Sequence, residues 1–221
     1  RSQLDTIQAL AFTSEFITST SWIFTYSGQK SVRQKNYNFF TSNLEIAGNL
    51  QSLITNGAGT VNENDFSTLF EVPVYQFGRL EIDYRQYLRV SKEHAWIGRI
   101  NAGYILPYGL SQFTSEGEEV RVPPFSRFFF LGGTNDLRAW PAYRAGGGIE
   151  QVSNDGDVDN NNFAIGTFKL LSNIEYRFPI ISSLKGALFV DAGNIWLSGG
   201  VETSESAVRL QNLARDLYIG S

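Results

Sequence analysis

Long runs of alternating polar and apolar residues dominate this sequence of 221 residues. Residues 79–90 alternate most cleanly, with charged side chains at every odd position except Tyr87 and mainly apolar side chains at the even positions. Successive side chains of a β-strand point to opposite faces, so a period of two predicts a strand with one polar and one apolar face.

Six strands are predicted from this pattern, over residues 18–26, 38–47, 79–90, 96–106, 168–178 and 184–196, and a seventh begins within 216–221. Their connections alternate between short (28–36, 91–95 and 179–183) and long (48–73, 107–162 and 197–215). A soluble antiparallel β-sandwich also has strands with one apolar face. Strands of about 9 to 14 residues joined by alternately short and long connections are instead typical of an outer-membrane barrel.

We therefore expect an all-β fold, an antiparallel transmembrane β-barrel of which residues 1–221 form part of a single domain. Bacterial single-chain barrels have about 8 strands or more, so the native protein should contain further strands. The opening Arg1 and the absence of Met are typical of a piece of a longer chain. By parity, one set of residues should face lipid: Leu80, Ile82, Leu88, Ile100, Tyr104, Leu170, Ile174 and Val190. The opposite set should face the lumen: Arg79, Glu81, Arg85, Arg99 and Lys169.

The composition removes several function classes. Eighteen basic residues against 22 acidic ones give a net charge of −4, which offers no electrostatic basis for nucleic-acid binding. The chain has no Cys, one His (His94) and no G-x-S-x-G pentapeptide, so we expect no metal site, no cofactor and no catalytic centre. Residues 155–159 resemble the front of a calcium loop, but Asn160 and Gly166 stand where that loop requires Gly and Glu.

The connection 107–162 is far longer than the usual loop of about 4 to 6 residues. Its middle contains Phe128, Phe129, Phe130 and Trp140, which would form an exposed apolar patch if the loop projected into water. We expect this extracellular loop to fold back into the barrel lumen.

Several motifs in this chain resemble the BamA/TamA superfamily of outer-membrane assembly and translocation barrels. Residues 130–140, Phe-Leu-Gly-Gly-Thr-Asn-Asp-Leu-Arg-Ala-Trp, are similar to the lumen-inserted sixth extracellular loop of that family. Residues 175–179 and 189–196 resemble the two strands that follow it, and residues 43–48 resemble an upstream strand. Ala139 stands where many members have Gly, and Trp140 where Phe or Tyr is commoner, a departure that resembles members from Bacteroidota.

The resemblance implies that Arg138 is the loop-tip arginine and that Glu175 and Asp191 are the lumenal carboxylates that receive it. Parity supports this independently, because Glu175 shares a face with Lys169 and Asp191 shares one with Lys185. A guanidinium has five donors and can bind two carboxylates at once. The expected loop motif comprises Phe130, Gly132, Gly133, Leu137, Ala139 and Trp140.

The function implied by the resemblance is non-enzymatic: assembly and insertion of barrel proteins into the bacterial outer membrane, or translocation of polypeptide across it. Its expected partners are the lipid bilayer, unfolded outer-membrane or secreted polypeptides, and accessory assembly subunits. A passive channel or surface antigen of the same architecture is an alternative. A soluble carbohydrate-binding β-sandwich is a further alternative, which extraction without detergent would distinguish.

Overall fold

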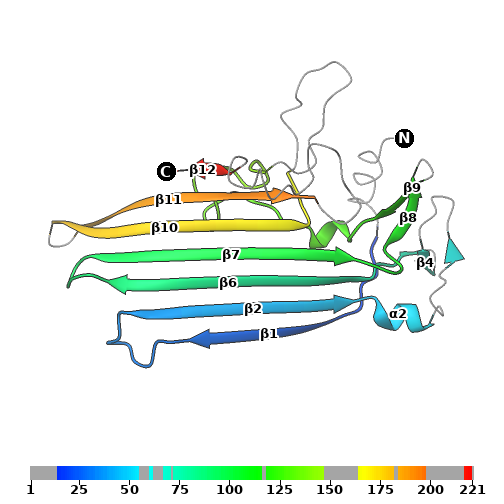
Figure 1. The fold of residues 1–221 in the computed structure, drawn as a ribbon, viewed down its shortest axis with the longest axis horizontal. Coiled ribbons are helices and arrows are strands. Elements are labelled where there is room, and N and C mark those ends of the chain that lie inside the picture. Colours follow the sequence, from blue (N-terminus) through cyan, green and yellow to red (C-terminus); the bar gives the residue numbers. More distant parts are fainter. Residues whose placement is uncertain are drawn as a thin grey trace, which may run out of the picture.

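A seven-stranded antiparallel sheet organises the chain (Figure 1). The computed structural model describes residues 14–54, 60–61, 67–70, 72–115, 118–146, 164–181, 184–197 and 217–220. The sheet has the order β1-β2-β6-β7-β10-β11-β12, so each strand pairs with the next long strand along the chain. It is an open sheet in the described residues, compatible with part of a barrel wall.

The bounds of these strands confirm the predicted ones to within three residues. They are β1 (Ser19–Ser27), β2 (Tyr37–Ala47), β6 (Phe77–Arg89), β7 (Ala95–Pro107), β10 (Phe168–Ile181), β11 (Leu184–Trp196) and β12 (Tyr218–Gly220). The short connections lie together at one end of the sheet and the long connections at the other (Figure 1). We call these the short-turn end and the long-connection end.

The largest difference from prediction is at the end of β10, which continues past Pro179 to Ile181. Proline has no N–H to donate to a sheet, so it usually marks the end of a strand. Here the register shifts between Pro179 and Ile181, which is the kind of irregularity that accommodates proline within a strand pair.

The long connections carry small elements of their own. Between β2 and β6 lie a short helix α2 (Asn49–Ile54) and a three-stranded sheet of β3 (Thr60–Val61), β4 (Ser67–Leu69) and β5 (Val72–Pro73). Between β7 and β10 lie a hairpin of β8 (Gln112–Ser115) and β9 (Glu118–Arg121) and a 3₁₀ turn, η1 (Phe125–Arg127). Among the described residues, no helix is long and apolar enough to cross a membrane.

The two faces of the large sheet differ in what covers them. On one face, large apolar side chains remain exposed, including Leu80, Leu88, Trp96, Ile100, Tyr104, Ile174, Leu188 and Val190. A contiguous apolar surface of this extent suits contact with lipid. The opposite face, which we call the polar face, carries the charged residues and is partly covered by the connection between β7 and β10.

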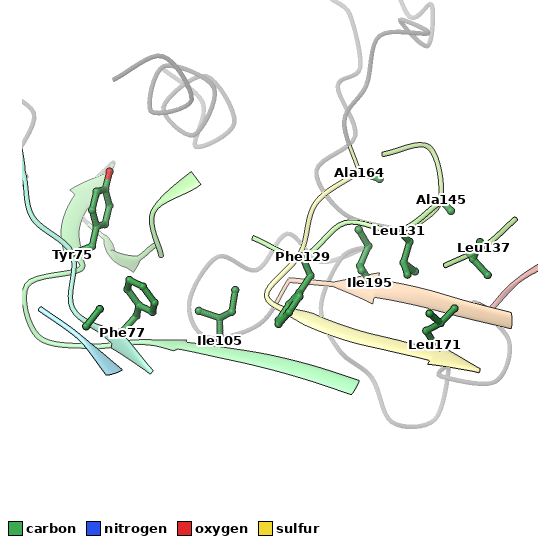
Figure 2. Packing of buried hydrophobic residues seen from close by; sticks show 11 residues of the cluster. Tyr75, Phe77, Ile105, Phe129, Leu131, Leu137, Ala145, Ala164, Leu171 and Ile195 are labelled. Carbon is green, nitrogen blue, oxygen red and sulfur yellow. The ribbon is translucent and has the colours of Figure 1, made fainter. Parts of the chain in front are cut away.

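The buried core lies on the polar face near the long-connection end (Figure 2). Four strand residues are fully buried although they point to the same face as the charged side chains: Phe77, Ile105, Leu171 and Ile195. They pack in one cluster with Phe129, Leu131 and Leu137 of the long loop. These apolar residues on the polar parity mark where the loop rests on the sheet.

We predict that Ile82→Arg destabilises the complete protein by about 2–4 kcal/mol if Ile82 lies near the bilayer midplane. The cost arises because an arginine on the lipid-facing side must lose hydration. Urea unfolding in lipid vesicles measures the effect, with Ile82→Leu as the control that keeps the site apolar. Equal stability of the two variants would show that this face does not contact lipid.

Candidate functional site

Two consecutive glycines shape the loop that rests on the polar face. Gly132 and Gly133 have φ angles of 100° and 89°, a backbone region that other residues rarely adopt. A Cβ at Gly132 would lie 2.0 Å from the carbonyl oxygen of Pro141. The Gly133 N–H donates to the Trp140 carbonyl at 2.8 Å. Residues 133–140 therefore form a closed turn whose tip carries the polar residues of the motif.

The guanidinium of Arg138 contacts both predicted carboxylates. Its Nη1 donates to Glu175 at 2.6 Å, while Nε and Nη2 donate to the two oxygens of Asp191 at 2.9 and 2.8 Å. The backbone N–H of Arg138 also donates to Asp191, at 3.1 Å. The pairing of β10 with β11 brings the two carboxylates within reach of one side chain.

The surroundings of Arg138 hold it charged and oriented. Its guanidinium carbon lies 3.9 Å from the centre of the Phe189 ring, a cation–π contact below the ion pairs. The hydrogen bonds that Arg138 donates to Asp191, followed by the one to Glu175, raise the pKa of Arg138 above its ordinary value. Asp191 is fully buried and also accepts a hydrogen bond from Asn173 at 2.8 Å. Four donor groups from two residues therefore offset the burial of this one carboxylate.

A second ion pair, which the sequence did not reveal, fixes the same loop with reversed polarity. Asp136 accepts from the Lys169 ammonium at 2.9 Å and lies 3.7 Å from the guanidinium of Arg99. Asn173 donates to the Asp136 carbonyl at 2.8 Å. Lys169 is 6% exposed, so its charge depends on this partner. The sequence indicated only that Lys169 faces the lumen, and it gave no indication of its partner.

The remaining motif residues connect the loop to its own turn and to β12. Leu137 is fully buried, and Phe130 stacks on Tyr143 with ring centres 4.2 Å apart. The Trp140 indole meets the Tyr218 ring edge-on at 5.3 Å and donates to the Ile219 carbonyl at 3.3 Å.

The substitution of Ala for Gly in the loop motif has a structural counterpart. Ala139 has no positive φ, so the turn does not require glycine at this position. A Cβ added to Gly220 of β12 would lie 2.6 Å from the Ala139 methyl group. The methyl group of Ala139 in the loop is therefore accommodated because the residue that faces it in β12, Gly220, has no side chain.

The loop contacts the strands in the order in which the sheet arranges them. Arg127 pairs with Glu45 of β2 at 3.3 Å, and Phe129 packs under Arg79 of β6 at 4.5 Å. The next contacts are those of Asp136 with β7 and β10, of Arg138 with β10 and β11, and of Trp140 with β12. Residues 127–140 therefore form a strap that crosses six strands. Residues 147–163, including the calcium-like segment, lie outside the described residues.

A family model described as the Omp85 superfamily domain matches residues 55–215. The chain belongs to the Omp85 superfamily. This confirms the resemblance to BamA/TamA barrels, and it agrees with the all-β antiparallel sheet. Omp85 proteins are outer-membrane β-barrels that in general insert or translocate polypeptides and are not enzymes. They contact the bilayer, polypeptide substrates and accessory subunits. Across the part of the chain that the structure describes, no group of three His, Asp or Glu residues could hold a metal ion.

We predict that exchanging the charges of Asp136 and Lys169 preserves the second ion pair. Asp136→Lys alone places three cations together and leaves Lys169 without a carboxylate, which costs up to about 3–5 kcal/mol for a buried pair. Adding Lys169→Asp should recover most of this loss, as measured by the free energy of unfolding of the complete protein.

The matched control for this exchange is Asp136→Asn, which removes the charge without adding a repulsive one and should be less destabilising than Asp136→Lys. A double variant no more stable than Asp136→Lys would show that the pair does not couple the loop to β10.

Proposed function

We propose that this Omp85 chain forms part of the wall of a bacterial outer-membrane barrel that inserts other barrel proteins or translocates polypeptide. In this proposal the polar face lines the lumen, the short turns lie in the periplasm, and residues 107–162 are the extracellular loop folded inward. The contact of Arg138 with Glu175 and Asp191 carries the proposal, because it ties the family's characteristic loop motif to two neighbouring strands.

The work of such a barrel requires no bond chemistry. An incoming strand adds to an exposed sheet edge through backbone hydrogen bonds, a process called β-augmentation. The strap would support this process by keeping the wall in one arrangement while an edge is offered. Arg138, Glu175 and Asp191 act as anchoring residues, and the loop motif from Phe130 to Trp140 supplies the shape that brings Arg138 to them.

The polar face also bears on the alternatives. A single sheet whose apolar face stays uncovered in the described residues does not form the two packed layers of a sandwich. A passive channel of this architecture would have to conduct past the strap. Measurable conductance, with assembly of other barrel proteins unaffected when this protein is lost, would favour that alternative.

We predict that Arg138→Ala in the complete protein reduces assembly or secretion activity, because two partly desolvated carboxylates lose their shared cation. The free-energy cost reaches about 3–5 kcal/mol for full burial and is smaller where water enters the lumen. Arg138→Lys should restore little, since an ammonium cannot reproduce the fork that serves both carboxylates.

The control is Glu175→Gln/Asp191→Asn combined with Arg138→Ala. Removing both carboxylate charges relieves the repulsion, so this triple variant should be more stable than Arg138→Ala yet equally inactive. Full activity of Arg138→Ala would remove the anchor from the mechanism.

We predict that a Glu- and Asp-specific protease spares the bond after Asp136 in the folded protein and cuts within residues 150–159, where Glu150, Asp155, Asp157 and Asp159 lie. Asp136 is protected because its carboxylate and carbonyl are both bound by strand residues. Mass spectrometry of the fragments measures the two rates. Arg138→Ala should accelerate cleavage after Asp136 selectively. Equal rates at both sites in the unmodified protein would contradict the inward fold.

A further inference from the structure

The short-turn end of the sheet has a charge opposite to that of the whole chain. Residues 28–36, 89–95 and 177–186 contain one acidic residue, Glu93, and seven basic ones: Lys30, Arg33, Lys35, Arg89, Lys92, Arg177 and Lys185. All seven basic side chains are exposed, whereas the chain as a whole has a net charge of −4. This end of the sheet would attract anionic groups.

Two cavities extend this charge along the polar face to the tip of the strap. The larger has a volume of about 630 Å³, and its charged lining consists of four arginines, Arg85, Arg99, Arg138 and Arg177, and two carboxylates, Asp136 and Glu175. The smaller, of about 180 Å³, lies at the short-turn end, where Lys35 and Arg89 line it together with Leu88 and Trp96 of the apolar face. Both are lined by Tyr87, Ile97 and Arg177, so they adjoin. We call the two cavities together the basic channel.

The carboxylates near the basic channel are less exposed than two of the four arginines that line the larger cavity. The side chains of Asp83, Asp136 and Glu175 are 13–16% exposed, and that of Asp191 is not exposed, whereas those of Arg85 and Arg177 are 40% and 57% exposed. Arg99 and Arg138 are more buried, at 17% and 25%. A ligand that enters the channel therefore meets the guanidinium groups of Arg85 and Arg177 first.

Two features leave cationic capacity for a ligand. Arg85 and Arg99 are directly opposite each other on β6 and β7, and they share Asp83, with each Nε 2.7 Å from a carboxylate oxygen. Like charges opposed across strands destabilise a sheet, and a further anion would relieve this. Within the described part of the chain, Arg177 binds Glu175 through Nε, so its two terminal nitrogens can serve a ligand.

We propose that the basic channel binds an acidic segment of polypeptide that enters from the short-turn end. Its carboxylates would contact Arg85 and Arg177, and its backbone would lie beside the stacked rings of Tyr37 and Tyr87, whose centres are 4.5 Å apart. A peptide fits better than a lipid headgroup because the larger cavity, which holds Arg85 and Arg177, lies on the polar face, opposite the exposed apolar side chains. This inference rests on the proposed function and specifies the chemistry of the substrate.

The test uses the complete protein in nanodiscs of zwitterionic lipid and a fluorescein-labelled peptide of alternating Glu and Ser, with a Lys-and-Ser peptide as the counterpart. The Glu peptide should bind, and its affinity should fall as ionic strength rises from about 0.01 to 0.1 M, where the Debye length shortens from about 30 to 10 Å. Arg85→Gln/Arg177→Gln should weaken binding about tenfold or more, equivalent to about 1.4 kcal/mol.

Arg121→Gln is the matched control, because Arg121 is an exposed arginine of β9 at the long-connection end. It should change the affinity less than about twofold. A second variant, Lys35→Gln/Arg89→Gln, alters the channel mouth away from the strap and should also weaken binding. It keeps the proposal testable if the first double variant fails to fold.

Binding of the Lys peptide as tightly as the Glu peptide would overturn the proposal, as would equal losses in Arg121→Gln and Arg85→Gln/Arg177→Gln. Nanodiscs containing anionic phosphatidylglycerol test the lipid source: the Glu peptide should still bind there, and complete loss of its binding would show that the channel takes a lipid headgroup and would also overturn the proposal. If the unmodified protein does not bind the Glu peptide while Arg138→Ala loses assembly activity, this inference alone is rejected. Full activity of Arg138→Ala would instead reject the anchoring function.

Discussion

A carboxylate with no exposed surface needs cationic or hydrogen-bonding partners, and Asp191 obtains most of them from a segment more than 50 positions earlier in the chain. Without Arg138, Asn173 would be its one remaining partner among the described residues. The position of the loop, the closed turn around Gly132 and the stack of Arg138 on Phe189 all serve this contact. Burial of one charge thus determines where the loop can lie.

The polarity of the two ion pairs adds specificity to this arrangement. Two positions apart, the loop presents an anion to Lys169 and a cation to Asp191. A shift of the loop that brought Asp136 toward Asp191 or Arg138 toward Lys169 would place like charges together. Ion pairs of this kind define a register more effectively than they add stability. The apolar cluster around Leu171 supplies contact area but would tolerate several loop positions.

The sequence predicted the long strands well because alternation records which face each side chain occupies, and it predicted the convergence of Arg138 with Glu175 and Asp191 from parity and resemblance together. It did not predict the pair of Asp136 with Lys169, because residues of a loop do not alternate and the direction of the Asp136 side chain therefore cannot be inferred from its position. The place where the loop packs could have been predicted from apolar residues at positions that otherwise carry charged side chains: Phe77, Ile105, Leu171 and Ile195. The continuation of β10 past Pro179 depends on a register shift that becomes visible once β11 is paired with it.

The strap limits how far the circumference of the barrel wall can change. Backbone ladders allow a sheet to curl more or less tightly, because each strand pair tolerates a range of twist. Side chains of residues 127–140 are attached at intervals from β2 to β12, so flattening or widening this arc would stretch a short peptide between fixed points. The ion pairs at Asp136 and Arg138 would have to open before the circumference could grow. In a barrel that changes diameter during its work, they would set the threshold for that change.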